Sequence, residues 1–357
     1  MTYKLSPTPH YELECIAIIN NIINNTPIKS ERDEIIKNRG NKHKAAVTEF
    51  FKLPIAMEDH MRKNINLVLP PFEQNGKQLA QFLFKQYASP TSHYAEAVFH
   101  HIMSLEHGVD SCETAIIDHL DETLVANAYG QNIISSCTPS EFFALVEKAN
   151  TTDEDKMAAM HLYYNFDMYH SYLAALLAHA KELYLQAGPN AATLAAPLMS
   201  TLESNLAESG SDYITGILGI TPDETDTHLI YPTLYRVNSF AASDVYGTNI
   251  VVCEFGLHLL DFIDRIKQTS DTATAEELLK CISDNTKRSI LQLLKKGPMY
   301  GSQLAKELNC TTANISHHLN RMLLIGIIRI VNENNRLYAH LEREKLHGLI
   351  DGLKEIF

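Results

Sequence analysis

Two short apolar stripes at helical spacing, separated by a polar break, constrain the fold of this chain more than any other feature. The first stripe lies in residues 302–308 and consists of Leu304, Ala305 and Leu308. Asn309 and Cys310 interrupt the pattern. A second helix is predicted over residues 312–324, and the side chains expected on its buried face are those of Ile315, Leu319, Met322 and Leu323. Two helices at this spacing predict a helix-turn-helix.

The residues after this motif predict a β-hairpin. Gly326 can end the second helix in a left-handed cap. Residues 327–331 and 336–341 are rich in β-branched and apolar side chains, which predicts two strands, and residues 332–335 predict the turn between them. A helix-turn-helix followed by a hairpin is typical of a winged-helix domain, in which the second helix reads the bases of double-stranded DNA and the hairpin contacts its backbone.

Polar side chains on the second helix can hydrogen-bond to base edges in the major groove. The predicted base-reading residues are Thr312, Asn314, Ser316 and His317. The predicted phosphate contacts are Lys306, Arg321, Arg329 and Arg336. His318 lies next to the apolar stripe, so we expect its ring to be half-buried and structural. The alternative interpretation is that Ser316 and His318 only stabilise the start of the helix or its packing.

These segments together resemble the ArsR/SmtB family of bacterial transcriptional regulators. The resemblance rests on Leu304 and Ala305, on the pattern Thr311-x-x-x-Ile-Ser-x-His-Leu-x-x-Met322, and on Gly326-Ile-Ile ahead of the wing. It covers about a quarter of the chain. The layout of the whole chain is similar to that of the larger members of the group, which implies an N-terminal domain that senses an effector or forms a dimer.

The charge of the chain is divided between its two ends. The sequence of 357 residues carries 30 Lys and Arg and 43 Asp and Glu, a net charge of −13. From Leu278 to Phe357 there are 12 basic and 7 acidic residues, a net charge of +5, so the preceding residues carry −18. A basic end on an acidic body is expected of a nucleic-acid-binding module joined to one that avoids phosphate. The alternative is that the basic surplus arises by chance.

The residues before this module predict a mainly α-helical body with a small β unit. Residues 1–267 are predicted to form the body, residues 268–273 a polar linker, and residues 274–357 the DNA-binding domain. The strand unit is placed at residues 228–253, where Pro232 suggests an edge strand. Helices are predicted at residues 11–23, 41–52, 75–88, 91–106, 111–128, 139–149, 156–186, 191–207, 254–267 and 274–282.

The terminal helix, predicted over residues 342–357, carries an apolar stripe too extensive for a free surface. The predicted dimerisation residues are Leu346, Leu349, Ile350 and Leu353. In the family that this segment resembles, the terminal helix and the helix before the first turn build a two-fold interface, which implies a homodimer. The alternative is that the stripe packs only on its own winged-helix domain.

Aromatic and titratable side chains gather on the long helix predicted in the body. The predicted effector-pocket residues are His161, Tyr164, Asp167 and His170. The alternative is that they line a core or a dimer seam. No segment supplies zinc ligands at readable spacing, and residues 302–308 lack the Cys pair that arsenic-sensing members of the family use. We therefore expect no metal and no cofactor.

The sequence predicts a cytoplasmic, homodimeric, repressor-like regulator that binds double-stranded DNA and whose body responds to a small molecule or a partner. It has no apolar run of membrane-spanning length and no signal peptide at its start. Its six cysteines are scattered singly, as in a reduced protein. Two alternatives stay open: a constitutive DNA-binding or protein-interaction scaffold, and an enzyme with an appended winged helix. No recognisable catalytic motif supports the enzyme.

Overall fold

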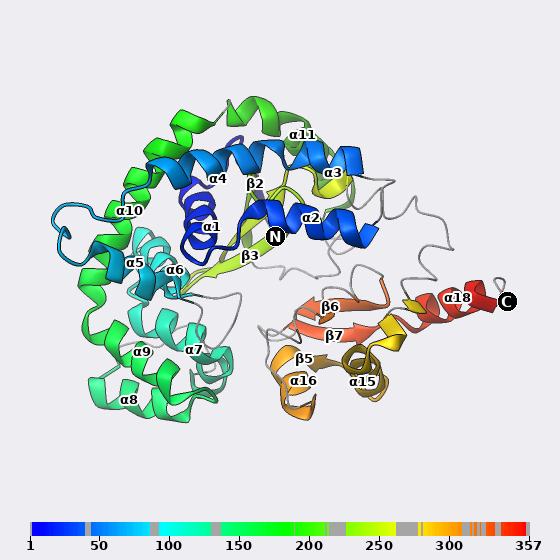
Figure 1. Ribbon diagram of the computed structural model, residues 1–357. Helices are drawn as coiled ribbons and strands as arrows, with labels where there is room; N and C mark the ends of the chain where they lie inside the picture. The colour runs from blue at the N-terminus through cyan, green and yellow to red at the C-terminus, as the bar shows by residue number, and fades with distance from the viewer. Residues whose placement is uncertain are drawn as a thin grey trace. The chain divides into compact units, whose positions relative to one another are not determined.

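A computed structural model describes most of the chain (Figure 1). The described residues are 2–39, 44–85, 93–129, 137–188, 190–210, 213, 226–261, 278–279, 281–308, 315, 318–319, 322, 326–332 and 337–354. The chain divides into two compact units: the body, residues 1–200 with 226–259, and the C-terminal unit, residues 201–225 with 260–357. The predicted linker at residues 268–273 lies outside the described residues, so its position stays a prediction.

The body is mainly α-helical, as predicted. Its helices are α1 Tyr11–Ile23, α2 Ile28–Arg39, α3 Lys44–Phe50, α4 Lys52–Asn64, α5 Gly76–Phe84, α6 Tyr94–Glu106, α7 Cys112–Tyr129, α8 Pro139–Lys148, α9 Asp153–Tyr164 and α10 Phe166–Ala187, together with α11 Ala191–Ser209 up to residue 200. α1 has the predicted bounds. α8 begins with a capping box, in which Thr138 N donates to Glu141 Oε2 at 2.8 Å and Glu141 N donates to Thr138 Oγ1 at 3.3 Å.

The structure corrects two predictions about helices. The single helix predicted over residues 156–186 is two helices, α9 and α10, separated at Asn165. The Asn165 amide Nδ2 donates to His161 O at 2.8 Å and so satisfies a carbonyl near the end of α9. α2 and most of α4 are absent from the predicted helices, because α2 is mostly polar and α4 carries Pro54, which a helix tolerates only in its first turn.

A four-stranded mixed sheet belongs to the body, with strand order β1-β2-β4-β3. Its strands are β1 Thr2–Leu5, β2 Thr227–Thr233, β3 Phe240–Val245 and β4 Ile250–Gly256. β1, β2 and β4 are parallel neighbours, and β3 is antiparallel to β4. The predicted strand unit is confirmed, but its sheet also takes a strand from the other end of the body, where Tyr3 pairs with His228.

β2 is an interior strand, so the edge position inferred from Pro232 is wrong. Ile230 O accepts a hydrogen bond from Ser6 N at 2.8 Å on the β1 side. Because alternate residues of a parallel strand direct their polar groups to the same neighbour, Pro232 faces the β1 side too, beyond the last residue of β1. A proline fits there because no strand residue remains to accept an N–H.

The helix predicted from residue 254 is wrong at its start, because β4 continues to Gly256. The loop after β2, residues 234–239, lies so close to this glycine that a Cβ atom would be 2.4 Å from Arg236 O. Gly256 N donates to Ser239 O at 2.8 Å, and His258 N donates to Val237 O at 2.7 Å. The end of β4 is therefore fixed to the loop after β2.

A buried carboxylate joins three parts of the body. Glu14 on α1 is 1% exposed. Its donors are Tyr184 Oη on α10 at 2.6 Å, the Thr233 hydroxyl, Leu234 N at 3.2 Å and Tyr235 N at 3.1 Å. Burial raises the pKa of Glu14 to about 7, although the hydrogen bonds from Thr233 and Tyr184 oppose the shift. The carboxylate thus ties α1 to α10 and to the loop after β2.

A second buried carboxylate continues this network. Glu58 on α4 is 3% exposed. Its Oε2 accepts from Tyr235 Oη at 2.6 Å and from Ile28 N at 2.8 Å, and its Oε1 accepts from Arg62 at 2.8 Å. Tyr235 therefore connects the two carboxylates, because its backbone N–H donates to Glu14 and its hydroxyl donates to Glu58.

The substitution Glu14→Gln is expected to change how stability depends on pH. Because the pKa of Glu14 is raised to about 7 from 4.5, its contribution to stability is complete below pH 4.5 and is lost as the pH rises through 7. A shift of this order is worth roughly 3 kcal/mol. The melting temperature of the wild type relative to the variant, measured by circular dichroism, should fall between about pH 4.5 and 7.5 and level off above that range.

Glu12→Gln is the matched control on the same helix. Burial raises the pKa of Glu12, but the hydrogen bond from Lys181 Nζ at 2.7 Å and the Lys181 charge leave it below its usual value. Glu12 therefore does not titrate in the same range, and its variant should run parallel to the wild type. A Glu14→Gln profile that is also parallel to the wild type would contradict the prediction.

Candidate nucleic-acid interface

The C-terminal unit contains the elements of a helix-turn-helix with a wing. They are α15 Asn285–Leu294, β5 Met299–Tyr300, α16 Gly301–Leu308, β6 Ile328–Asn332, β7 Leu337–Leu341 and α18 Arg343–Lys354. The strands form a sheet with order β5-β7-β6, in which both pairs are antiparallel. The described residues of the predicted second helix, 315, 318, 319 and 322, are helical.

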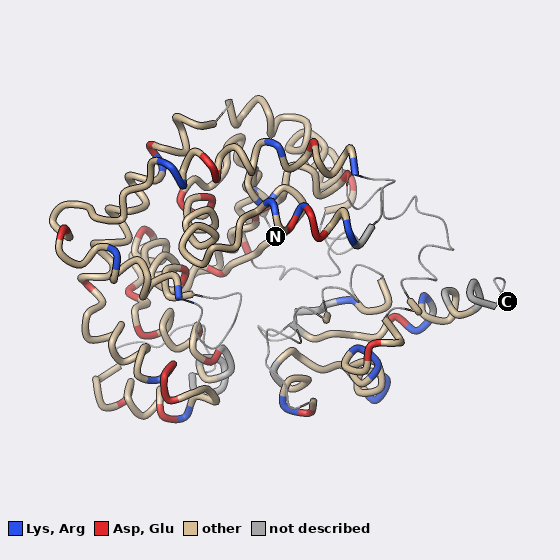
Figure 2. Tube along the Cα trace, in the orientation of Figure 1, with Lys and Arg blue, Asp and Glu red and all other residues tan. Residues whose placement is uncertain are grey.

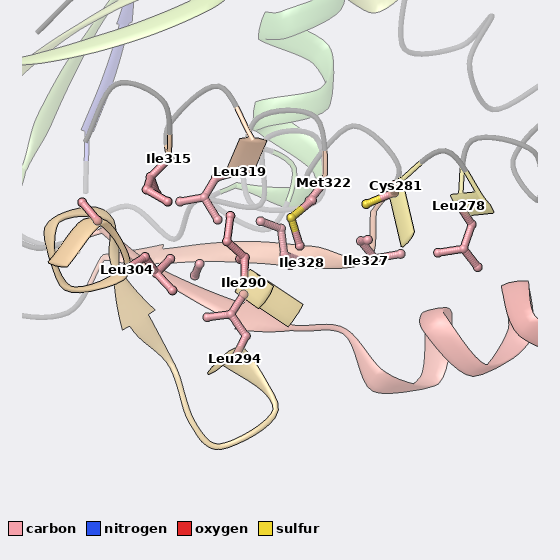
Figure 3. Packing of buried hydrophobic residues seen from close by; sticks show 12 residues of the cluster. Leu278, Cys281, Ile290, Leu294, Leu304, Ile315, Leu319, Met322, Ile327 and Ile328 are labelled. Atoms are coloured by element: carbon pink, nitrogen blue, oxygen red, sulfur yellow. The ribbon is translucent and has the colours of Figure 1, made fainter. Parts of the chain in front are cut away.

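One apolar cluster holds these elements together (Figure 3). Its buried members are Leu278, Cys281, Ile290, Leu294, Leu304, Ala305, Ile315, Leu319, Met322, Ile327, Ile328 and Ala339. Ile315, Leu319 and Met322 are at most 8% exposed, as predicted for the inner face of the second helix. The fourth predicted member, Leu323, lies outside the described residues. Burying each such side chain stabilises the unit by roughly 1.5–3 kcal/mol, so packing holds the second helix in place.

α15 is absent from the predicted elements, although it supplies Ile290 and Leu294 to this core. Its N-cap is Asp284, whose Oδ1 accepts from Lys287 N at 3.0 Å. This hydrogen bond lowers the pKa of Asp284. An Asp cap followed by apolar residues at helical spacing is a recognisable start signal, so the sequence does carry the evidence for this helix.

The second helix ends at a left-handed glycine, as predicted. Gly326 has φ +74°, and Ile327 N donates to Met322 O at 3.2 Å, which is the long hydrogen bond of a Schellman cap. The wing follows at once, with Ile328 paired to Leu341. Glu342 N then donates to Ile327 O at 2.9 Å and closes the base of the hairpin.

The predicted base-reading residues lie outside the described residues, so their role stays a prediction. They are Thr312, Asn314, Ser316 and His317. His318, which is described, is 9% exposed and belongs to the buried side of the helix. This burial is greater than expected and supports the structural interpretation of its ring.

Two of the four predicted phosphate contacts are described. Lys306 is an exposed residue in the last turn of α16. Arg329 on β6 is half-exposed, and its Nε lies 2.7 Å from Glu342 Oε1, so a phosphate would have to share or replace this ion pair. Arg321 and Arg336 lie outside the described residues.

Further basic side chains of the C-terminal unit lie outside the predicted phosphate contacts. They are Lys287 and Arg288 on α15, Lys295 and Lys296 in the turn directly after it, and Arg343 and Lys345 on α18 (Figure 2). Lys295 and Lys296 are exposed at the end of α15. These charges account for most of the positive surplus of this end of the chain and favour an anionic partner.

The predicted dimerisation residues do not share one environment. Leu346 packs against the core of its own unit, whereas Ile350 is 36% exposed. The side chains of Leu349 and Leu353 lie outside the described residues. Leu279, in the helical segment before α15, is 44% exposed. The interpretation that the stripe packs on its own domain therefore holds for Leu346, while Ile350 and Leu279 leave apolar surface for a partner.

The predicted effector-pocket residues lie on two helices. His161 on α9 is bound to Tyr169, with 2.9 Å between His161 Nε2 and Tyr169 Oη. Tyr164 is 66% exposed. On α10, Asp167 is exposed, and the ring of His170 lies 6.0 Å from that of His101. This arrangement does not by itself bring the four side chains to one ligand.

Among the residues that the structure describes, no group of three or more His, Cys, Asp or Glu side chains is placed to hold a metal ion. Within the same residues, no helix combines the length and the apolar character that a membrane span requires.

A capped α15, a second helix packed against α16, and an antiparallel hairpin after a Schellman glycine define a winged-helix DNA-binding protein. The family model described as "Bacterial regulatory protein, arsR family" matches residues 284–329. The transcriptional repressor SdpR of Bacillus subtilis (strain 168) is 35% identical over 74 residues, which are 21% of this chain and 82% of SdpR. The chain belongs to the arsR family of bacterial regulatory proteins.

The likeness to SdpR leaves most of the body without a counterpart, because it extends over 74 residues of the chain. No solved structure gives a significant match to the chain. The family relation therefore accounts for DNA binding and transcription regulation, and the role of the body has to be argued from its own residues.

The Schellman glycine should be more sensitive to substitution than a glycine within a helix. Gly326→Ala is expected to cost about 1 kcal/mol, because an L side chain is disfavoured at a positive φ. Gly348→Ala, on an exposed turn of α18 with open space around the Cβ position, is expected to stabilise the unit by about 0.5–1 kcal/mol. Hydrogen exchange of the β6 and β7 amides in the full chain measures both effects. Faster exchange in both variants, or in neither, would contradict the assignment of Gly326 as the left-handed cap of the second helix.

Proposed function

We propose that this protein is a homodimeric transcriptional repressor whose body binds a small-molecule effector and thereby changes the DNA affinity of its C-terminal unit. The observation that carries the proposal is the winged helix itself, together with 35% identity to a protein described as a transcriptional repressor. In a two-state regulator, an effector acts only through different affinities for the DNA-bound and free states.

In this proposal the second helix reads base edges and the wing contacts the backbone. Thr312, Asn314, Ser316 and His317 are the base-reading residues, because their amide, hydroxyl and imidazole groups match the donor and acceptor pattern of the major groove. Lys306, Arg321, Arg329 and Arg336 contact phosphates. The burial of Ile315, Leu319 and Met322 supports this division, since these three residues anchor the helix by one face.

Base-reading and phosphate residues should differ in their effect on specificity. Asn314→Ala or His317→Ala is expected to weaken binding to the preferred site by ~1–3 kcal/mol and to leave binding to random DNA nearly unchanged. Arg336→Ala should weaken both about equally and lower the slope of log affinity against log salt by about 1. Fluorescence anisotropy on the selected site and on a random duplex, at several salt concentrations, measures both quantities.

Arg32→Ala is the matched control for loss of a positive charge. Arg32 belongs to α2 of the body and is paired with Asp33 at 2.7 Å, so its removal should leave the affinity and the salt slope unchanged. Equal losses on specific and random DNA for His317→Ala would overturn the base-reading assignment.

The homodimer is proposed from apolar surface on the two elements that build the family interface. Ile350 on α18 and Leu279 before α15 are both exposed in the single chain. A two-fold contact through them would cover this surface and present two second helices to successive turns of DNA. Leu349 and Leu353 complete the proposed stripe, and Leu346 supports it from the core of the unit.

A charge placed in this surface should dissociate the dimer. Ile350→Asp is expected to shift the protein from dimer to monomer in sedimentation equilibrium, because an unpaired carboxylate would be buried in an apolar contact. Leu194→Asp, at a residue of similar exposure on α11, is the control and should leave the dimer intact. Dissociation by Leu194→Asp with no effect of Ile350→Asp would place the interface in the body.

The effector part of the proposal is tested by sequencing DNA fragments that the purified protein selects, with and without a cell extract of small molecules. We expect a palindromic site whose enrichment changes with the extract. Failure to enrich any palindrome at low salt would overturn the DNA-reading proposal, and enrichment that ignores the extract would leave a constitutive DNA-binding protein.

A further inference from the structure

A hollow of about 260 Å³ lies between the turn that joins α1 to α2 and the middle of α4. It is lined by Asn25, Pro27, Ile28, Lys29, Ile55, Glu58, Asp59 and Arg62. Its apolar wall comes from Pro27, Ile28 and Ile55, and the rest of the lining is polar or charged. This volume lies just below the roughly 300–1,000 Å³ of ordinary ligand pockets, so the hollow can take only a small ligand. Its lining is more polar than in most such pockets, which favours a polar or charged ligand.

Glu58 lines the hollow, but both of its carboxylate oxygens already accept hydrogen bonds from the protein. Its two carboxylate oxygens accept hydrogen bonds from Ile28 N, Tyr235 Oη and Arg62, all at 2.8 Å or less. The ion pair with Arg62 neutralises its charge at 2.8 Å. Glu58 therefore shapes the hollow and leaves recognition to other groups.

Three polar side chains of the lining remain available. Lys29 and Asp59 are exposed, and neither forms an ion pair or hydrogen bond with another described residue. Asn25, at φ +53°, likewise has its amide open to a ligand. The hollow therefore offers one free ammonium group, one free carboxylate and one amide that both donates and accepts.

We propose that this hollow binds a small zwitterion of amino-acid size. Lys29 and the first turn of α2 would hold its carboxylate, because the N-terminus of a helix also attracts negative charge. Asp59 would hold its ammonium group, and Asn25 would complete the hydrogen bonds. A plain anion fits less well, since Asp59 and the strongly acidic body would repel it.

The hollow is connected to the end of β4 by contacts already described. Glu58 binds the hydroxyl of Tyr235, which belongs to the loop after β2. That loop is fixed to β4 by the hydrogen bond from Gly256 N to Ser239 O at 2.8 Å. Shortly after β4 the chain passes from the body into the C-terminal unit. A ligand beside Glu58 is therefore linked, through Tyr235 and the loop after β2, to the strand that precedes the passage into the C-terminal unit, which makes it a candidate for the effector of the proposed function.

The probes are the twenty L-amino acids, added singly to the full chain without DNA and followed by thermal shift and calorimetry. We expect one amino acid, or a few related ones, to bind, and we expect its N-acetyl and carboxamide derivatives to bind roughly tenfold more weakly or worse, since each lacks one charge. Binding by none of the twenty, or equal binding by the derivatives, would overturn the proposal.

Substitutions then locate the site. Lys29→Met and Asp59→Asn change exposed residues and should keep the fold, as circular dichroism checks, while each weakens binding roughly tenfold or more. Lys63→Met is the control, because Lys63 lies on α4 with Asp59 but does not line the hollow. This variant should bind the amino acid as the wild type does. Unchanged binding in both Lys29→Met and Asp59→Asn would overturn the site.

A DNA readout separates this inference from the proposed function on which it rests. DNA affinity without amino acid tests the regulator alone, and amino-acid binding without DNA tests the hollow alone. If both hold, Tyr235→Phe should keep amino-acid binding but reduce the ligand-induced change in DNA affinity, because it removes the hydroxyl contact with Glu58. If Tyr235→Phe keeps the full ligand-induced change in DNA affinity, the proposed coupling through Tyr235 is wrong.

Discussion

The arrangement of the body depends on a carboxylate buried among neutral donors. Glu14 accepts hydrogen bonds from a tyrosine, a threonine and two backbone N–H groups, and none of these carries a positive charge. Burying a carboxylate is costly unless its hydrogen bonds are satisfied, so the loop after β2 is held where its N–H groups reach Glu14. The same loop then positions Tyr235 for Glu58 and packs on Gly256. One acidic side chain thus organises α1, α10 and the end of the sheet.

The sequence predicts the elements whose signals are local. The capping box at Thr138 and the glycine at 326 give the start of one helix and the end of another, because each depends on residues at most a few positions away. The pairing of β1 with β2 has no such signal, since its partners are more than two hundred residues apart. The edge position inferred from Pro232 is wrong for the same reason, because an interior strand accepts a proline at this position only where β1 has already ended.

The candidate sites divide in the same way. The winged helix follows from a compact apolar pattern, and Ile315, Leu319 and Met322 are buried as that pattern predicts. The hollow beside α4 does not follow from the sequence, because Lys29 and Asp59 come from helices that sequence patterns do not reveal. Their charges also look like ordinary solvated surface until the fold brings them to one cavity. A site whose residues come from separate helices can be recognised only in the tertiary structure.

The strand order of the body has a consequence for synthesis on the ribosome. β1 is made first, but its partner β2 begins at Thr227, so at about 5–20 residues per second the first strand waits roughly ten to forty-five seconds for a neighbour. The winged helix forms its hairpin from residues only a few positions apart and has no such delay. The nascent body, with an unpaired strand and exposed apolar helices, is the part of this regulator on which chaperones would act.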